Sequence, residues 1–237
     1  MIHSIWLELL IVSLVCNSNY YIKMKVVSFV PIRLNSKRVL GKNLKMLGGK
    51  PLLCYILDTL VKVRRIDEVY VYCSDEKIVD YLPEGVRFLK RPHRLDSDET
   101  LGREIYEEFT NTVDADVYVL AHTTSPFIKS ETIDVALSKI LDEDFDSAFS
   151  AEKIQTFVWY KGKTLNYDLK DIPRTQTIEP VFVETSAFFI FKREIWKVHK
   201  QRIGFKPYIA EVDKIEGVDI DWPEDFVFAE KILRTYC

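Results

Sequence analysis

Apolar runs and helix-spaced segments alternate along most of this chain, and they predict strands and helices in turn. Residues 25–32, "KVVSFVPI", form a continuous apolar run with β-branched side chains, which is typical of a strand buried in a parallel sheet. A basic loop comes next, and "KPLLCYILDTLVKV" then has helical spacing. Further strands are expected at "DEVYVYCSD", "VRFLKRP", "ADVYVLAHTTSPF", "FDSAFSAEK" and "VFVETSAFFIFKR". Further helices are expected at "KIVDYLP", "TLGREIYEEFTNTV" and "SETIDVALSKILDED", the last with Ser130 as its N-cap.

This alternation predicts one α/β domain over residues 24–237, with a doubly wound, mostly parallel, Rossmann-like sheet. The pattern breaks at about residues 154–183, where the sequence is polar, rich in turn residues and without helical spacing. We interpret this stretch as an inserted β-excursion or a dimerisation arm. "VDIDWPEDFVFAEKIL" then predicts a strand end followed by a last helix, with Pro223 at its first position.

Residues 1–23 do not fit this pattern. They contain an apolar run from Ile5 to Cys16, interrupted by Glu8, that is short for a membrane span and lacks the basic start of a signal peptide. We expect an extension outside the fold, produced from an upstream start codon, with an anchor or signal as the alternative. The nucleotide chemistry inferred below favours a cytoplasmic protein without a membrane partner.

The overall composition limits the classes of partner. With 33 Lys and Arg against 36 Asp and Glu, the formal net charge is -3, whereas a general nucleic-acid binder has a broad basic surface. We therefore expect no nucleic-acid partner. The four Cys form no C-x-x-C pair and only four His are present, which argues against a structural zinc site or a disulfide framework.

One short segment departs from this mild acidity. "FVPIRLNSKRVLGKN" carries Arg33, Lys37, Arg38 and Lys42, and no acidic residue occurs between residues 25 and 57. The loop follows the first strand, and doubly wound sheets bind ligands beyond the carboxyl ends of their strands. It is neither a P-loop nor a dinucleotide fingerprint. Several cations on one loop suit a polyphosphate, although a solvated basic loop would look similar.

A pair of carboxylates near the other end of the chain suggests a metal. Asp219 and Asp221 are two residues apart, so on an extended segment they point to the same face. Two such carboxylates repel one another unless a cation lies between them, and hard oxygen ligands suit Mg²⁺ shared with substrate phosphates. The alternative is that one Asp caps the last helix and the other is merely exposed.

Six segments in series give the chain a resemblance to a known family. "VPIRLNSKRVLGKNLKMLGGKPLL" resembles the opening motif of the CMP-sialic acid synthetases, the acylneuraminate cytidylyltransferases. "RPHRLDSDET" resembles their R-P-x-x-L-A-x-D segment, and "LAHTTSPF" their L-x-Q-P-T-S-P. "DSAFSAEK", "PRTQ" and "VDIDWPEDFVFAE" resemble their D-S-V-F-S, P-R-x-Q and terminal D-I-D-x-x-x-D-x-x-x-A-E motifs.

The resemblance implies an enzyme of the nucleotide-diphospho-sugar transferase fold that joins CTP to an acidic keto-sugar and releases pyrophosphate. By analogy, the triphosphate would be held by Arg33 and Lys42, with Lys37 close by. Asn43 and Arg91 would bind the rest of the nucleotide. Asp219 and Asp221 would hold Mg²⁺, with Asp221 a candidate proton relay. The inserted arm implies a homodimer.

Departures from the family pattern gather on the acceptor side. Ile32 replaces the usual Ala, His122 and Thr123 stand where many members have Gln and Pro, and Thr185-Ser186, after Glu184, replaces an Asn-Gly pair. The resemblance makes His122, Thr123 and Thr185 substrate-facing, and it makes Arg174 a candidate for the sugar carboxylate or the phosphates. We therefore expect retained nucleotide chemistry with a sugar acid other than N-acetylneuraminic acid.

Three alternatives stay open at this stage. D-x-D also holds the metal of some glycosyltransferases, although there it usually lies nearer the middle of the chain. A CMP-octulosonate synthetase is the neighbouring cytidylyltransferase, but its loop lacks the S-K and K-N features of residues 36–37 and 42–43. A catalytically inactive binding module would bind CTP without turnover.

Overall fold

The computed structural model describes residues 23–36 and 38–236, so residues 1–22 of the expected extension at residues 1–23, and residue Lys37, lie outside the described residues. Eleven strands are assigned there: β1 (Val26–Ile32), β2 (Met46–Leu47), β3 (Lys50–Pro51), β4 (Glu68–Cys73), β5 (Val86–Lys90), β6 (Val117–Ala121), β7 (Ser147–Ile154), β8 (Trp159–Tyr160), β9 (Lys163–Thr164), β10 (Val181–Lys192) and β11 (Pro207–Val212). The α-helices are α2 (Leu52–Lys62), α3 (Gly102–Thr112), α4 (Ser130–Leu141), α5 (Arg193–His199) and α6 (Pro223–Tyr236). Three 3-10 helices are η1 (Lys42–Leu44), η2 (Glu76–Tyr81) and η3 (His93–Asp96).

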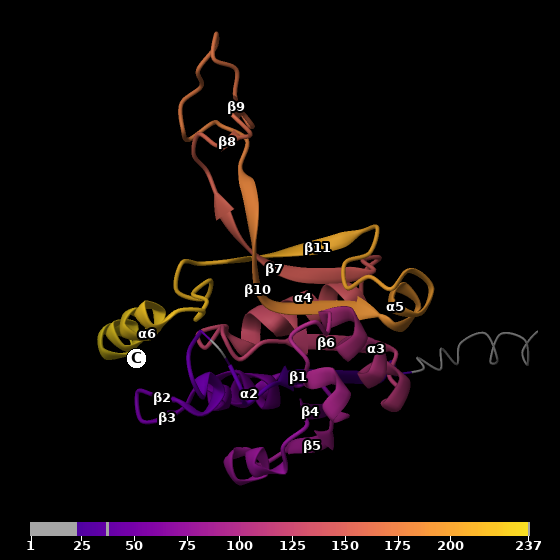
Figure 1. Ribbon diagram of the computed structural model, residues 1–237. Coiled ribbons are helices and arrows are strands. Elements are labelled where there is room, and N and C mark those ends of the chain that lie inside the picture. The colour runs from indigo at the N-terminus through magenta and orange to yellow at the C-terminus, as the bar shows by residue number, and fades with distance from the viewer. Residues whose placement is uncertain (1–22, 37, 237) are drawn as a thin grey trace, which may run out of the picture.

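The centre of the fold is a seven-stranded sheet in the order β11-β7-β10-β6-β1-β4-β5 (Figure 1). β1 pairs in parallel with both β4 and β6, and β4 pairs in parallel with β5. β10 alone runs against its neighbours β6 and β7, while β11 is again parallel to β7. The predicted mostly parallel α/β fold is confirmed, with one reversed strand that the alternation of segments did not predict.

Both faces of this sheet are buried because helices cover them. Along β1, Val26, Val30 and Ile32 belong to one apolar cluster, to which α2 and α4 contribute. Phe29 belongs to the opposite cluster, where its ring stacks on Phe109 of α3 with the centroids 4.1 Å apart. Burial on both faces explains why the first strand is a continuous apolar run rather than an alternating one.

A third, smaller apolar cluster lies beyond the carboxyl end of β1. Val39 of the basic loop packs there with Ile220 and with Phe226 of α6. The short β2–β3 hairpin adds Leu47, and its Gly48 lies so close to α6 that a Cβ there would be 2.6 Å from Leu233 Cδ1. This cluster brings the two ends of the domain together.

The segment between β7 and β10 leaves the domain as a long arm (Figure 1). β7 and β10 pair antiparallel from the sheet out to Ile154 and Val181, and the β8–β9 hairpin lies further out. The segment at about residues 154–183, interpreted from the sequence as a β-excursion or an arm, corresponds to this part of the structure. The register of β7 and β10 shifts between Glu184 and Phe189, so an irregularity marks the point where the arm joins the sheet.

Two local predictions are wrong. Ser130 does not cap α4, because its hydroxyl donates to Glu131 while the carboxylate of Glu216 accepts from the Lys129 backbone N–H. Asp219 and Asp221 do not lie on a sheet strand, although their segment is extended. The elements β2, β3, α5 and β11 were not predicted, because they are short or lack clear periodicity.

Candidate active site

The basic loop and the Asp pair, far apart in sequence, meet at the carboxyl edge of the sheet. Lys42 Nζ donates to the Ile220 carbonyl at 2.9 Å and lies 3.2 Å from an Asp221 carboxylate oxygen. Arg38 contacts the other oxygen of Asp221 at 2.5 Å. The predicted convergence of the first loop with the terminal carboxylates is therefore present in the fold.

The shape of the basic loop depends on one glycine. Gly41 has φ +61°, in the left-handed region that glycine enters without strain. The chain then turns into η1, where the Leu44 N–H donates to the Gly41 carbonyl at 2.9 Å. This turn directs Lys42 toward the Asp pair, and only 13% of the Lys42 side chain is exposed.

The two Asp residues lie in an irregular segment just before α6. Ile220 is fully buried between the two residues, and its N–H donates to the Thr124 carbonyl at 2.8 Å. Asp225 caps the start of α6 by accepting from the N–H groups of Asp221 and Trp222. Neither Asp219 nor Asp221 is therefore needed as the helix cap.

The two carboxylates have opposite electrostatic surroundings. Loss of water around Asp219 raises its pKa despite a hydrogen bond from Thr124, and the neighbouring Asp221 charge adds to the increase. Partial burial also acts to raise the pKa of Asp221, but hydrogen bonds from Lys42 and Arg38 outweigh it and lower that pKa. Hydrogen-bonded cations therefore dominate at Asp221, whereas loss of water dominates at Asp219.

The pair fits a shared ion better than a metal site built by protein alone. Across residues 23–36 and 38–236, no three His, Cys, Asp or Glu side chains converge as a metal site. Mg²⁺, however, commonly takes one or two carboxylates and completes its shell with substrate phosphates and water. The hard oxygens of Asp219 and Asp221 match that donor set.

Arg33 leaves the end of β1 beside the same edge. Its guanidinium contacts Asp98 at 3.0 Å and the Asp96 carbonyl at 3.3 Å, and about a third of the side chain is exposed. A phosphate could therefore still reach the free edge of the guanidinium fork. The structure brings Arg33 to the carboxyl edge, as predicted.

Asn43 and Thr123 form a buried connection beneath the loop. Asn43 donates to the Arg33 carbonyl at 2.8 Å, and Thr123 donates to the Asn43 side-chain oxygen at 2.6 Å. Both residues are buried. Their contacts fasten the basic loop to the end of β6, so they act first as supports, and direct contact with a nucleotide or sugar stays a prediction.

Arg91 is deeply buried, with 2% of its side chain exposed, and it pairs with Asp96 at 2.6 Å. Its Nε is buried without a hydrogen-bond partner among the described residues. Burial acts to raise the pKa of Asp96, but hydrogen bonds from Ser74, Arg91 and His93 together lower it. A buried cation with an unused donor at this edge is consistent with a ligand-binding role.

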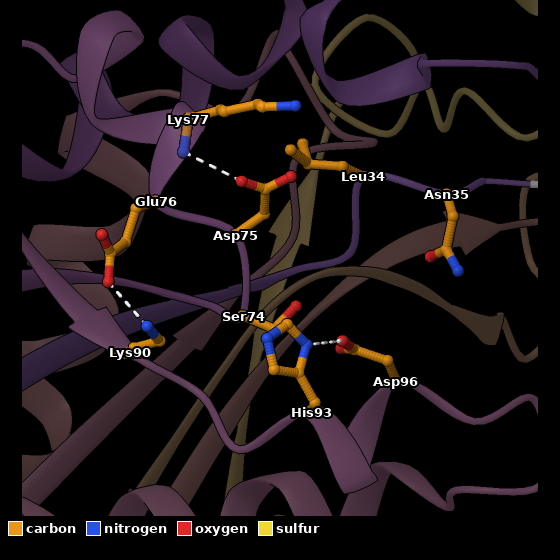
Figure 2. Close-up of a pocket in the computed structure, with 9 residues that line it drawn as sticks. All are labelled: Leu34, Asn35, Ser74, Asp75, Glu76, Lys77, Lys90, His93 and Asp96. Carbon is orange, nitrogen blue, oxygen red and sulfur yellow. Dashed lines mark hydrogen bonds and ion pairs between the residues drawn. The ribbon is translucent and has the colours of Figure 1, made fainter.

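A cavity of about 510 Å³ opens between the basic loop and the ends of β4 and β5 (Figure 2). In this view the His93 ring faces the Asp96 carboxylate, and Glu76 faces Lys90. The residues that line this 510 Å³ cavity are Leu34, Asn35, Ser74, Asp75, Glu76, Lys77, Lys90, His93 and Asp96. A second cavity, of about 280 Å³, includes Arg33, Arg91 and His122 in its lining.

His122 is held in one orientation on the wall of the second cavity. Its Nδ1 lies 2.6 Å from the Ser186 carbonyl, which can only accept, so Nδ1 carries the proton and Nε2 is left as an acceptor. Burial lowers the pKa of His122, the Ser186 hydrogen bond opposes this, and the charges of Arg202 and Lys42 lower the pKa further. His122 is therefore a neutral acceptor.

Ser186 and Thr185 lie at the irregularity of β10. Ser186 has φ +59°, an uncommon conformation for a residue with a Cβ, and this turn aims its carbonyl at His122. Thr185 donates its hydroxyl to Ser150 at 2.9 Å and packs near Gly217, just before the Asp pair. The predicted substrate-facing segment is thus beside the site, although the Thr185 hydroxyl itself is engaged.

Arg174 is separated from these residues. It is exposed and belongs to the segment between β9 and β10, which is part of the arm that projects from the sheet (Figure 1). Sequence reasoning also missed Tyr106 of the second cavity and Arg202, which pairs with Glu184 at 2.9 Å. A lone Arg in an unpatterned loop gives no signal that could have identified it.

With this geometry established, comparison with known proteins decides the family. A protein-family model described as "Cytidylyltransferase" matches residues 27–236 of the sequence. The chain belongs to the cytidylyltransferase family. The match covers both the basic loop and the Asp pair, so the sequence resemblance to the acylneuraminate branch is consistent with it.

Individual relatives refine the picture within the cytidylyltransferases. The N-acylneuraminate cytidylyltransferase of Streptococcus agalactiae serotype III (strain NEM316) is 24% identical over 86% of this chain and 52% of its own length. That of Oncorhynchus mykiss is 26% identical over 90% of this chain and 51% of its own. A 3-deoxy-manno-octulosonate cytidylyltransferase of Pelobacter propionicus is 28% identical over 51% of this chain and 46% of its own length. The chain spans about half the length of these curated relatives.

Solved structures support the fold. A CMP:2-keto-3-deoxy-manno-octonic acid synthetase complexed with CTP superposes with a TM-score of 0.66 at 15% identity, covering 90% of this chain and all of that chain. A 4-diphosphocytidyl-2C-methyl-D-erythritol synthase from Anaerococcus prevotii gives a TM-score of 0.61 at 13% identity, covering 90% of this chain and 97% of that chain.

Among the described residues, no helix has the length and apolar character needed to cross a membrane.

Proposed function

We propose that this cytidylyltransferase joins CTP to an acidic, sialic-acid-like keto-sugar, giving a CMP-sugar and pyrophosphate in the cytoplasm. The observation that carries the proposal is the contact of Lys42 with Asp221 across the carboxyl edge, which unites a cation-rich loop with a metal-type carboxylate pair. The names of the relatives support the sugar class.

In the proposed reaction, the anomeric hydroxyl oxygen attacks the α-phosphorus of CTP. A new P–O bond forms, the bond between the α-phosphorus and the oxygen that bridges it to the β-phosphate breaks, and pyrophosphate leaves with that oxygen. The hydroxyl proton passes to solvent, with Asp221 as the candidate relay. Negative charge grows on the phosphate oxygens, so cations placed beforehand stabilise the transition state. Arg33 and Lys42, with Lys37 nearby in sequence, are the residues to which we assign this task.

We further propose that Asp219 and Asp221 hold Mg²⁺ together with the phosphates. When bound, the ion would neutralise phosphate charge and make the attacking hydroxyl more acidic. Asp221 must then exchange part of its contacts with Arg38 and Lys42 for the metal. Those two side chains would be released toward the triphosphate, where their charges are needed.

The two cavities suggest an arrangement of the two substrates. The cavity shown in Figure 2 suits the cytidine; Asp96 lines it and pairs with Arg91, which lines the second cavity. The cavity beside His122 suits the sugar, whose hydroxyl groups could donate to the free Nε2. Arg33 lines this second cavity and donates to the carbonyl of Asp96, which lines the first, and this position supports our assignment of the phosphates to the region between the two cavities.

We also propose a homodimer formed through the arm. The arm exposes large apolar side chains, including Trp159 (56%), Leu169 (59%) and Ile172 (62%), and such patches usually mark interfaces. Arg174 would then reach the partner's site rather than its own. Measuring the molecular mass in solution before and after truncation of residues 157–178 tests this assembly.

Pyrophosphate release tests the activity. The purified protein is supplied with CTP, Mg²⁺ and a panel of acids: N-acetylneuraminic acid, a legionaminic acid, a pseudaminic acid and 3-deoxy-manno-octulosonic acid. We expect turnover that needs both CTP and a nine-carbon acid. The proposal would be refuted if none of the acids in the panel gave pyrophosphate release. It would also be refuted if the protein only transferred sugar from a ready-made sugar nucleotide.

A further inference from the structure

Arg202 is the cation beside the acceptor cavity to which the proposed chemistry assigns no task. It lies in the loop that follows α5, and its side chain is about one-third exposed. Its guanidinium carbon stands 3.7 Å from the centroid of the Phe189 ring, so the planar group is fixed by stacking. Arg202 also acts to lower the pKa of the Tyr106 hydroxyl, which burial raises.

These contacts locate Arg202 at the acceptor side of the site. The ring of Phe189 that supports it also lies edge-on to His122, with the centroids 6.2 Å apart. Tyr106 lines the cavity that contains His122 and Arg33, and it also lines a neighbouring cavity of about 540 Å³ that contains Arg202. Tyr106 therefore separates the two cavities, and Arg202, which lines only the larger one, approaches the acceptor cavity through its stacking on Phe189.

The anionic partner of Arg202 is Glu184, at 2.9 Å. From Val181 to Glu184, β10 pairs with β7 in one continuous register, and Glu184 is the last residue of that run. The irregularity with Thr185 and Ser186 follows directly. About a third of its side chain is exposed, and ion pairs of this kind contribute little to stability. An incoming carboxylate could take its place at small cost.

We propose that Arg202 binds the carboxylate of the acidic sugar, and that Glu184 occupies this position in the free protein. The inference rests on the proposed function, because it assigns a residue to the acceptor of that reaction. A planar guanidinium held by an aromatic ring matches a carboxylate with two parallel hydrogen bonds.

The ratio of kcat/KM for a sugar acid to that for its methyl ester measures carboxylate recognition. The probe is the panel acid with the highest turnover, together with its ester. In Arg202→Gln we expect KM for the acid to rise roughly ten- to a hundredfold, while KM for CTP stays unchanged. The acid-to-ester ratio should collapse toward one, and Arg202→Lys should recover only part of it.

A second variant separates binding from support. If Glu184 competes with the substrate, Glu184→Gln lowers KM for the acid severalfold; if the pair merely fastens the loop, the same change raises KM. The matched control is Lys206→Gln. Lys206 also pairs with an acid, Asp144 at 2.8 Å, and lies over a phenyl ring, that of Phe145 at 5.5 Å, and it lines neither cavity.

The outcomes are distinguishable. Wild-type turnover with an unchanged acid-to-ester ratio in Arg202→Gln would overturn the assignment of Arg202 and leave the proposed function standing. An equal loss for acid and ester would do the same, because it indicates that Arg202 only shapes the pocket. Absence of turnover with every acid would refute the proposed function and this inference with it.

Discussion

The nucleotide side and the acceptor side of this site are built in different ways. On the nucleotide side, Lys42 and Asp221 face each other from the two ends of the domain, on segments fixed by a shared apolar cluster. On the acceptor side, His122, Glu184 and Arg202 depend on an irregular strand and a loop. The first arrangement suits chemistry common to all substrates of such an enzyme, and the second can change with the sugar.

The largest expected effect lies on the nucleotide side. Asp221→Asn and Lys42→Ala each remove one charge from the position where the phosphates gather, so kcat should fall roughly a hundredfold to a thousandfold. The loss should be the same for every acid that the enzyme uses, since the phosphates are common to all. Initial rates of pyrophosphate release measure it, and a loss confined to one acid would contradict the division into two sides.

A smaller effect is expected where the Asp pair is anchored. Glu216 is buried and accepts from the Lys129 N–H and from the Thr132 hydroxyl, which ties residues 213–221 to the start of α4. Glu216→Ala leaves these donors without a partner and should lower the free energy of unfolding by about 1–3 kcal/mol.

Ser130→Ala is the matched control for Glu216→Ala at the same helix end. Because the Ser130 hydroxyl does not cap α4, its loss should change stability by less than about 0.5 kcal/mol. Urea unfolding of the two variants compares them directly. Equal losses would show that the helix, rather than Glu216, anchors the segment.

The smallest effect concerns His122. Burial lowers the pKa of His122 in the folded protein. As the pH falls, the folded state therefore takes up a proton at a lower pH than the unfolded state, whose His titrates near 6.5. The contribution of neutral His122 to stability is complete above about pH 6.5 and is lost as pH falls through the lowered folded pKa. The free energy of unfolding is measured as a function of pH, and in His122→Gln the decrease in stability below about pH 6.5 that comes from His122 should be absent.

The same histidine reports on Arg202. Since the positive charge of Arg202 helps to lower the pKa of His122, Arg202→Gln should raise that pKa toward its ordinary value. Imidazole titration by nuclear magnetic resonance gives the pKa of each variant. An unchanged value would place Arg202 too far from the acceptor cavity for the role assigned to it.

Sequence reasoning succeeded where one pattern corresponds to one physical cause. The apolar run of β1 is buried on both faces, and Ile220 between Asp219 and Asp221 is fully buried. The basic loop was identifiable because its charge departs from that of the chain. These features gave the fold class, the arm and the meeting of the two charged segments.

The remaining features depend on contacts between distant segments. The reversed direction of β10 follows from the arm, and nothing in its own apolar run indicates direction. Arg202 becomes notable only because Phe189 and Glu184 fold against it, and the cap on α4 comes from Glu216. Asn43 and Thr123 are likewise defined by a hydrogen bond between residues eighty positions apart.

A crystal structure with CTP and Mg²⁺ tests the central claim most directly. The account predicts triphosphate oxygens within hydrogen-bond distance of Arg33 and Lys42, and a magnesium ion shared between the phosphates and the carboxylates of Asp219 and Asp221. A nucleotide bound with its phosphates away from the basic loop, or a metal that touches neither carboxylate, would contradict it.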